Sequence, residues 1–510
     1  MTPTPRKFAR DSLGLAITQY LVRAMSMGRS FIAAKLLDPT SFGAWNALQL
    51  MMDYGALAPL GTQQGLDQLV PRRLVEGDAT RTAQLKRAAL FNAIALTLLF
   101  SAFGLSWASV GSSRMRSLWH LSGLSLALLC VMLVNVANLG TGILRSHGDI
   151  GGLTRWYVLQ GLIGSGLGLV LLVWFGRWGL LWGWFAGCLI AFLFVAVRAR
   201  HVFPLLPTPA VESLDLLQVG LPLYVFASSS IIMRNLDRIV VLRFLGTQAL
   251  GFYGLSVNVL TLLMAIPDSL AYVSYPMLVR RYSEAREDPE AIRERVERLV
   301  RGVSTALPLA AGLCALWSRD LVHTVLPRYD ACVEPLQVLA FGAAGLSQAA
   351  FASLVLMTVG RRIILVPSAV FLTALSGGLQ LLSLRWNGGL TGIAAASAVA
   401  YLMSGAVLMS LAAAGLGYSF RRMFVLIVRC FLPTALAATL CWGASWAFLR
   451  ELGPFTLMAF ARLLAASAAF TTAYLLFVAP FARGIGFISL AQEFKVPFFG
   501  RRPEGPEGPR

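Results

Sequence analysis

The sequence predicts an all-α polytopic membrane protein with about fourteen transmembrane helices, and three observations lead to that fold class. Of its 510 residues, 57% are hydrophobic and only 13% are charged, whereas soluble globular proteins carry about 25% charged residues. Apolar runs of about 20 residues, long enough to span a bilayer, recur along the whole chain. Most of the 43 Lys and Arg residues lie in the loops between those runs.

The apolar runs define fourteen expected spans joined by short loops. The spans cover residues 12–37, 43–66, 85–109, 118–144, 153–174, 178–198, 215–244, 248–274, 299–318, 333–359, 363–384, 389–414, 423–447 and 457–481. Placing the N-terminus in the cytoplasm puts most Lys and Arg residues on the cytoplasmic side, as the positive-inside rule requires. Both termini are therefore expected in the cytoplasm.

The N-terminal segment has one feature of a signal peptide, since Arg6, Lys7 and Arg10 precede its first apolar run. However, Arg23 and Arg29 interrupt that run, and no small-residue cleavage site follows at the right distance. We interpret the run as a retained first transmembrane helix.

Several function classes are disfavoured by the composition. The net charge of +19 invites a nucleic-acid interpretation, but basic nucleic-acid binders cluster charge on a soluble face with stacking aromatics. The scattered cysteines and histidines form neither a C-x-x-C pair nor a ligand spacing, so no metal, cofactor or disulfide framework is predicted. Walker, G-x-S-x-G and H-E-x-x-H motifs are absent from the sequence, which predicts a protein that is not an enzyme.

An internal repeat divides the chain. Asp38 and Pro39 suit the cap and first position of the second helix, and a shift of 208 residues lays Lys35–Trp45 on Arg243–Tyr253. Six spans separate the copies, so both halves enter the membrane in the same direction, as in transporters with parallel repeats. The division predicts two six-helix lobes, two extra spans and a cytoplasmic tail with a disordered end: residues 1–205, 206–415, 416–485 and 486–510.

The cytoplasmic loop at residues 275–299 has an amphipathic pattern. Asp288-Pro289 reads as a helix start, and Ile292, Val296 and Leu299 follow on one face. We expect an amphipathic helix lying on the inner membrane surface; the alternative is a solvated charged linker.

Charged side chains within the spans are the main functional candidates, since each costs at least ~2.5 kcal/mol at the bilayer centre. Arg23 and Arg29 lie six residues apart in span 1, while Arg234 and Arg238 share one face of span 7 beside Asp237. The structural alternatives are neutralisation of Arg238 by Asp237, or arginines capping carbonyls of neighbouring helices. For Arg429 and Arg462 in spans 13 and 14, snorkelling to the interface explains the charge better.

Arginines in a membrane cavity favour planar, multivalent anions such as phosphate and pyrophosphate, because the guanidinium presents a fixed fork of donors. Polar side chains on the same helices are candidates for hydroxyl-rich groups, or for ordinary interhelical hydrogen bonds: Asn46, Gln49, Asn135, Asn138 and Asn258. Asp53, Asp237 and Asp268 are carboxylates placed to bind a coupling proton or cation; alternatively, Asp268 only caps a helix broken at Pro267.

The Arg-x5-Arg pattern followed by Leu36-Leu-Asp-Pro-Thr-Ser-Phe-Gly43 resembles the start of polysaccharide flippases. These are the Wzx-type, O-antigen and exopolysaccharide proteins of the multidrug/oligosaccharidyl-lipid/polysaccharide exporter superfamily. The resemblance implies two six-helix lobes in a V shape and movement of undecaprenyl-diphosphate-linked oligosaccharide to the periplasmic leaflet of the bacterial inner membrane. By position, Arg23 and Arg29 match the family's cavity arginines that hold the diphosphate, and Arg234 and Arg238 match less closely.

Alternatives remain open beside that resemblance. Lipid II flippases share the basic first helix and the two extra helices, whereas multidrug exporters extrude cations, which an arginine-lined cavity disfavours. A membrane polymerase or ligase would need a longer outer loop than this chain has. The expected partners are the lipid-linked glycan, the bilayer and polysaccharide polymerase or export machinery, with a monomer as the expected state.

Overall fold

The computed structural model describes residues 5–110, 121–147, 149–200, 204, 206–208, 211–448 and 457–482, which contain helices and turns but no β-strand. The expected disordered tail lies outside these residues. The helices are α1 (Pro5–Leu36), α2 (Pro39–Gly55), α3 (Thr62–Glu76), α4 (Ala79–Val110), α6 (Leu121–Ser146), α7 (Ile150–Val158), η1 (Leu159–Ile163), α8 (Gly164–Phe175), α9 (Arg177–Arg198), α10 (Glu212–Val240), η2 (Val241–Leu245), α11 (Thr247–Glu284), α12 (Glu290–Val325), η3 (Pro327–Cys332), α13 (Val333–Thr358), η4 (Arg362–Ile364), α14 (Leu365–Arg385), α15 (Gly389–Gly415), α16 (Phe420–Phe448) and α17 (Leu457–Ala482).

Each of the fourteen expected spans corresponds to one helix or to consecutive helical segments, which confirms the all-α membrane fold. Within the described residues, 11 helical segments are long and apolar enough to cross a bilayer. The expected spans outside that set are α1, the α2–α3 pair and α10. These three spans carry the candidate arginines and two of the candidate carboxylates, so the polar residues are concentrated where sequence analysis placed a site.

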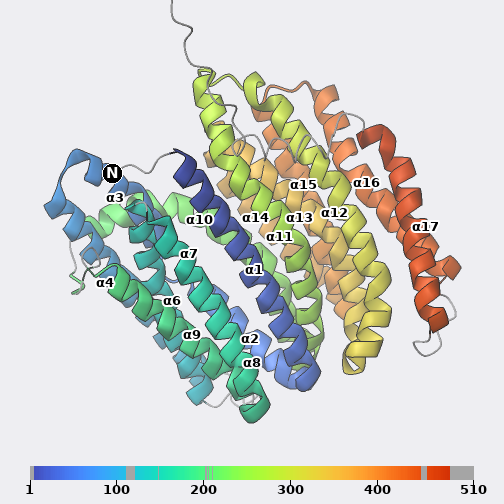
Figure 1. Ribbon diagram of the computed structural model, residues 1–510, viewed down its shortest axis with the longest axis horizontal. Helices are drawn as coiled ribbons and strands as arrows, with labels where there is room; N and C mark the ends of the chain where they lie inside the picture. The colour runs from blue at the N-terminus through green and yellow to red at the C-terminus, as the bar shows by residue number, and fades with distance from the viewer. Residues whose placement is uncertain are drawn as a thin grey trace, which may run out of the picture.

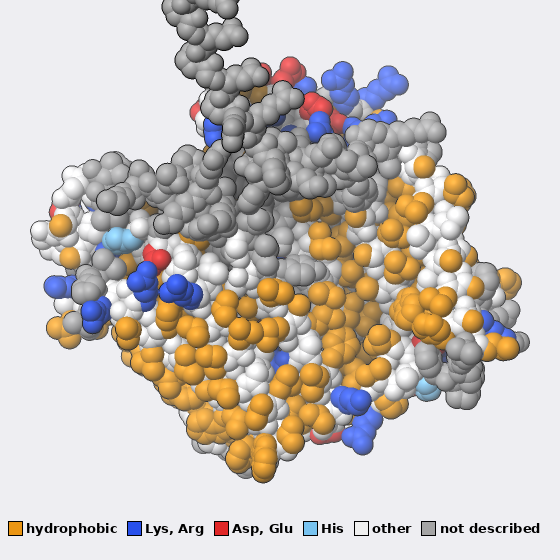
Figure 2. All heavy atoms as spheres, viewed as in Figure 1, with side chains coloured by type: hydrophobic (Ala, Val, Ile, Leu, Met, Phe, Trp, Pro, Cys, Tyr) orange, Lys and Arg blue, Asp and Glu red, His pale blue; other side chains and the backbone are white. Residues whose placement is uncertain are grey.

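The helices form two lobes, which we define as α1–α9 and α10–α15. Figure 1 shows the first lobe in blue to green and the second lobe in colours from green at α10 to light orange at α15, with α17 at the outer edge next to α16. Helices α16 and α17 pack on α12 of the second lobe. Hydrophobic side chains cover the middle of the face in Figure 2, and many charged ones lie toward its edges, as expected of a surface that meets lipid.

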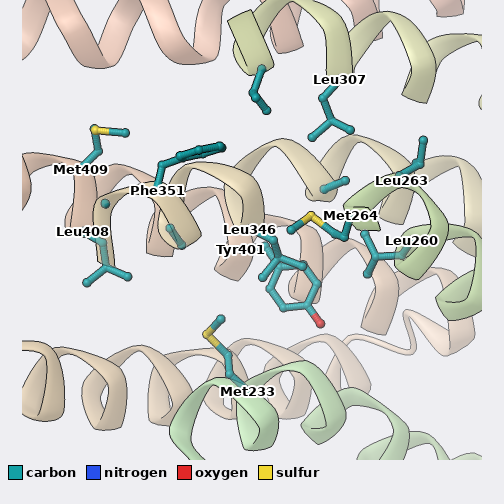
Figure 3. Close-up of a cluster of buried hydrophobic side chains, with 14 of the residues drawn as sticks. Met233, Leu260, Leu263, Met264, Leu307, Leu346, Phe351, Tyr401, Leu408 and Met409 are labelled. Carbon is teal, nitrogen blue, oxygen red and sulfur yellow. The ribbon is translucent and has the colours of Figure 1, made fainter. Parts of the chain in front are cut away.

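The core of the second lobe forms from its own helices. Figure 3 shows Met233 of α10, Leu260 and Met264 of α11, Leu346 of α13 and Tyr401 of α15 converging on one region. All five are buried. This packing gives α10 and α11 fixed positions against the lobe, and these are the helices that carry its candidate site residues.

Asp38 caps α2 as predicted. Its Oδ2 atom accepts hydrogen bonds from the backbone N–H groups of Thr40 and Ser41, both at 3.1 Å, and Pro39 occupies the first helical position. Partial burial raises the pKa of the Asp38 carboxyl, but the hydrogen bonds from Ser41 and Thr40 outweigh burial and hold that pKa below its ordinary value. The cap therefore stabilises the folded chain most when the carboxyl is ionised.

We expect Asp38→Ala to lower the free energy of unfolding by about 1 kcal/mol, because α2 loses its cap. Asp38→Asn keeps an acceptor and is the matched control. Since the folded pKa is depressed, the advantage of the wild type over Asp38→Ala is present at neutral pH and shrinks as the carboxyl becomes protonated in acid. Thermal unfolding at several pH values measures both effects, and equal midpoints at neutral pH would contradict the cap.

The second expected span is broken, which the sequence analysis did not anticipate. Helix α2 ends at Gly55, and α3 begins at Thr62 after a turn with positive φ at Leu60 (46°) and Gly61 (88°). Pro59 lies in this turn, where its carbonyl accepts a hydrogen bond from Thr62 Oγ1 at 2.7 Å. The equivalent residue in the repeat, Pro267, lies inside the continuous helix α11. The alternative that Asp268 caps a broken helix is therefore wrong.

The prediction of an amphipathic helix on the membrane surface within residues 275–299 is also wrong about where that helix lies. Residues up to Glu284 continue α11, and α12 begins at Glu290 and runs without interruption into the bundle. The predicted start is correct, since Asp288 Oδ1 accepts a hydrogen bond from Glu290 N at 2.9 Å. The apolar face at Ile292 and Val296 is buried in the core of the second lobe rather than turned to lipid, because an extended α12 offers protein partners for it.

The two copies of the repeat turn meet at one end of the molecule, which we call the turn end and define by residues 37–42 and 241–251. A Cβ added at Gly43 would lie 1.9 Å from the carbonyl oxygen of Thr247, and one at Gly251 would lie 2.1 Å from that of Pro39. The shift of 208 relates Gly43 to Gly251 and Pro39 to Thr247, so each glycine approaches the other copy in the same way. Only glycine permits this close approach of backbones.

The turn end joins the two lobes through a shared apolar cluster. Phe42 packs edge-to-face on Tyr329 of η3, with ring centroids 6.0 Å apart, and the Tyr329 hydroxyl donates to the carbonyl of Leu37 at 3.2 Å. Leu255 of α11 is buried in the same cluster. In this conformation the lobes are therefore packed together at the turn end.

Candidate functional site

Two arginines from different lobes converge on one carboxylate. Arg23 Nη1 on α1 lies 3.1 Å from Asp268 Oδ2 on α11, and Arg234 Nη2 on α10 lies 3.8 Å from Asp268 Oδ1. The side chains of Arg23 and Asp268 keep 43% and 25% of their surface accessible. The group thus combines two positive charges with one negative charge and remains open to a ligand.

A second contact between the lobes lies between α2 and α10. Arg238 Nη2 is 3.5 Å from Asp53 Oδ2, and the same guanidinium donates to Asn235 Oδ1 on its own helix. Arg238 therefore does not pair with the neighbouring Asp237 carboxylate through its side chain. The structural alternative, neutralisation of Arg238 by Asp237, does not describe this arrangement.

Arg29 lies apart from the other three arginines. Only 3% of its surface is exposed, and its guanidinium lies over the rings of Trp45 (5.6 Å to the centroid) and Trp184 (4.9 Å). Its Nε and Nη1 atoms have no hydrogen-bond partner among the described residues. Arg29 is thus held in the first lobe by cation–π contacts, while Arg23, six residues earlier, turns toward the second lobe.

Asp237 is fully buried in the second lobe. Its Oδ2 accepts hydrogen bonds from the hydroxyls of Tyr253 (2.8 Å) and Tyr401 (3.2 Å), and its Oδ1 accepts one from the backbone N–H of Arg238 (2.7 Å). Figure 3 shows the Tyr401 ring among the apolar side chains of this lobe. Among the described residues, no side-chain cation pairs with Asp237.

The two buried charges occupy equivalent places in the repeat. The shift of 208 relates Arg29 to Asp237 and also Trp45 to Tyr253. In each lobe the first helix supplies the charge, the second helix supplies an aromatic partner, and the sixth helix supplies another: Trp184 of α9 in the first lobe and Tyr401 of α15 in the second. The lobes thus hold opposite charges with one architecture.

The candidate amides divide into engaged and available side chains. Asn46 is buried and donates to the carbonyl of Phe42 on its own helix, and Asn135 is buried and donates to the Gly55 carbonyl and Thr97 Oγ1. Asn135 thereby supports the end of α2 at the break. Gln49, Asn138 and Asn258 are half-buried and make no side-chain hydrogen bond with the described residues.

The sequence analysis did not identify Asn235 or the four aromatic side chains that contact Arg29 and Asp237. The repeat register itself contains Trp45 and Tyr253, so their equivalence with the charge positions was a usable signal. Trp184 and Tyr401 carry no such signal, because they belong to the sixth helix of each lobe, and only the folded lobe brings them to the charge.

Together, the helical bundle, its two related lobes and the charged groups between them define the class of protein: its fold is that of multi-pass membrane transporters. It is similar to an inward-facing multidrug resistance MATE family transporter of the MOP superfamily, at 17% identity over 81% of this chain and 98% of that one, with a TM-score of 0.62. An outward-facing structure of such a transporter gives 17% identity over 84% and 99%, with a TM-score of 0.57. A MOP superfamily transporter from Pyrococcus furiosus, described as having a binding pocket of reverse polarity, gives 17% identity over 84% and 99%, with a TM-score of 0.58.

The chain belongs to the polysaccharide biosynthesis protein family, whose profile matches residues 32–334. A comparison with curated proteins found no match. The family and the fold are those of membrane transporters and flippases.

Proposed function

We propose that this protein is a flippase that moves undecaprenyl-diphosphate-linked oligosaccharide from the cytoplasmic to the periplasmic leaflet of a bacterial inner membrane. The observation that carries the proposal is the convergence of Arg23 and Arg234 on Asp268 from two lobes. Two guanidiniums around one carboxylate form a site preorganised for an oxyanion, and a diphosphate offers more acceptor oxygens than the carboxylate does.

In the proposed mechanism, the diphosphate of the substrate replaces the carboxylates of Asp268 and Asp53 as the partner of the arginines during alternating access. The Arg23–Asp268 contact joins α1 to α11, and the Arg238–Asp53 contact joins α10 to α2. A bound diphosphate would compete with Asp268 and Asp53 for these arginines and so weaken the links that hold the lobes in the present conformation. Ligand binding is then coupled to lobe movement through differential contacts.

Arg29 takes a different role in this proposal. It is buried against Trp45 and Trp184, yet two of its nitrogen atoms lack hydrogen-bond partners. A rearrangement of α1 would bring these unpaired N–H donors of Arg29 to the diphosphate, whereas Arg23 is already accessible. Gln49, Asn138 and Asn258 remain the amides available for sugar hydroxyls, because Asn46 and Asn135 are committed to backbone carbonyls and Thr97.

The proposed coupling group is Asp237. Asp53 and Asp268 have arginine partners across the lobe boundary, whereas Asp237 is fully buried and forms no side-chain ion pair with the described residues. A buried carboxylate of this kind favours a proton or a cation, since an isolated charge is costly in an apolar medium.

The sign of the charges disfavours cation export. Arg23, Arg234 and Arg238 are expected to repel organic cations from the region between the lobes, and the carboxylates there are already paired with arginine. The reverse-polarity pocket described for the Pyrococcus furiosus transporter indicates that this fold serves more than one kind of substrate. Lipid II carries the same diphosphate, so the arginines alone do not separate it from other lipid-linked glycans.

Transport of the lipid-linked oligosaccharide in proteoliposomes tests the proposal. We expect Arg23→Ala and Arg234→Ala each to reduce transport about 10- to 100-fold, the effect of losing a hydrogen bond to a charged group. Arg385→Ala is the matched control, because Arg385 is exposed at the end of α14. Wild-type transport by both site variants would refute the site, and transport of lipid II in preference to the oligosaccharide would reassign the substrate.

A further inference from the structure

A second basic site lies away from the lobe boundary, at the end of the bundle defined by residues 284–290 and 415–422, which we call the basic end. A pocket of about 480 Å³ lies there between α12 and α16. Four arginines line it, Arg301 of α12 and Arg421, Arg422 and Arg429 of α16, against the single carboxylate of Glu297. The pocket therefore carries a clear excess of positive charge.

The one carboxylate of the pocket is already engaged. Glu297 forms an ion pair with Arg301 one turn later on α12 and accepts a hydrogen bond from the Tyr418 hydroxyl. Arg293 donates to the carbonyl of Leu416 at 2.6 Å and lies over the Tyr418 ring at 4.9 Å. These contacts tie the α15–α16 connection to α12 and so fix where α16 begins.

The other three arginines have no such partner. Arg421, Arg422 and Arg429 are exposed and form no ion pair or hydrogen bond with the described residues. Arg421 and Arg422 lie in the first turn of α16, where the helix dipole disfavours cations. Helix stability therefore does not explain them, and the first-turn N–H groups of this 29-residue helix add to the attraction for an anion.

The neighbouring surface of α16 is apolar. Phe420, Phe424 and Val428 recur every fourth residue along one side of α16 and are 79%, 61% and 40% exposed, as expected of side chains that face acyl chains. Arg429 lies seven residues beyond Arg422, about 10 Å further along the helix axis. The pocket thus borders lipid and spans the depth of a headgroup and its glycerol ester region.

We propose that this pocket binds the phosphate group of an anionic phospholipid in the adjacent leaflet. The arginines would hold the phosphate oxygens, and the acyl chains would lie along Phe424 and Val428. Basic pockets between transmembrane helices on the cytoplasmic side favour such headgroups, and the positive-inside rule assigns the basic end to the cytoplasm. A lipid bridging α12 and α16 would fasten α16 and α17 to the second lobe.

Lipid retention by the purified full-length protein tests the site. In nanodiscs of mixed phosphatidylglycerol and phosphatidylcholine, we expect the wild type to retain phosphatidylglycerol preferentially, as measured by mass spectrometry of bound lipid. The double variant R422A/R429A should lose this preference by about fivefold per arginine. R280A is the matched control, because Arg280 is exposed at the same end but pairs with Glu284.

Further arms separate a lipid from a free anion. R422K/R429K keeps both charges and should keep most of the preference, which also guards against misfolding of the alanine variant. Millimolar inorganic phosphate should not displace the bound phosphatidylglycerol. Equal retention of the two lipids by the wild type would overturn the proposal, and full replacement by inorganic phosphate would overturn its lipid part.

Discussion

Gly43→Ala is expected to reduce transport at least 10-fold while leaving the protein inserted in the membrane. The added Cβ would lie 1.9 Å from the Thr247 carbonyl oxygen and 2.9 Å from the Gly251 nitrogen. Both are backbone atoms, so no side-chain rotation relieves the clash, and overpacking of this kind costs about 1–3 kcal/mol or more. The substitution must separate α2 from α11 and therefore disfavours the conformation in which the lobes pack at the turn end.

A native cysteine reports on that separation. Cys332 is fully buried in the turn-end cluster, so labelling by a membrane-impermeant maleimide should be low in the wild type and higher in Gly43→Ala. Gly251→Ala should show the same loss of transport and the same increase in labelling, because its added Cβ would meet the Pro39 carbonyl oxygen. Gly166→Ala is the control, since its Cβ would meet nothing within 4 Å. Normal transport with Cys332 still protected would show that the lobes do not need this contact.

The parts of the fold that depend on local chemistry and on the repeat were predictable from sequence. The Asp38 cap requires only a side-chain acceptor before Pro39, and the span assignment requires only apolar length. The 208-residue shift located Gly43 and Gly251 as turn glycines. That they touch was not predictable, because a repeat in sequence does not specify which surfaces the two copies share.

Features that depend on tertiary contacts could not be predicted from the sequence. The face of Ile292 and Val296 is amphipathic in either setting, and only the extension of α12 onto the second lobe decides between lipid and protein. Asn135 looked available for sugars because its partners, the Gly55 carbonyl and Thr97 Oγ1, belong to other helices of the folded bundle. Pro59 and Pro267 are equivalent in the repeat, yet only the first accompanies a break, where Gly61 supplies a positive φ.

The candidate arginines show the same division. The sequence identified four arginines within the expected spans, but side-chain direction decides what each can do. Arg23 and Arg234 reach the carboxylate of Asp268, while Arg29 turns into its own lobe beneath Trp45 and Trp184. A six-residue spacing places the two arginines of α1 roughly 120° apart around the helix, which is enough to direct them into different environments.

Asp237→Ala is expected to cause a large loss of both stability and transport. It removes the acceptor of two buried hydroxyls, those of Tyr253 and Tyr401, and each unsatisfied buried group costs about 1–3 kcal/mol. Tyr253→Phe and Tyr401→Phe each remove one donor instead and should cost only about 1 kcal/mol. Thermal unfolding of the three variants measures these differences, and a midpoint for Asp237→Ala near that of the wild type would contradict the hydrogen-bonded arrangement.

Asp237→Asn separates the charge of this group from its packing. The amide keeps the size of the side chain and one acceptor oxygen, so the variant should remain folded. If Asp237 carries the coupling proton or cation, its transport should no longer respond to an imposed proton or sodium gradient, whereas Arg385→Ala should respond like the wild type. An unchanged gradient response in Asp237→Asn would leave Asp237 a structural residue. The related position in the first lobe is Arg29, which carries a positive charge where the second lobe carries the Asp237 carboxylate. If transport is coupled to a cation, we therefore expect the cation to bind the second lobe rather than the first.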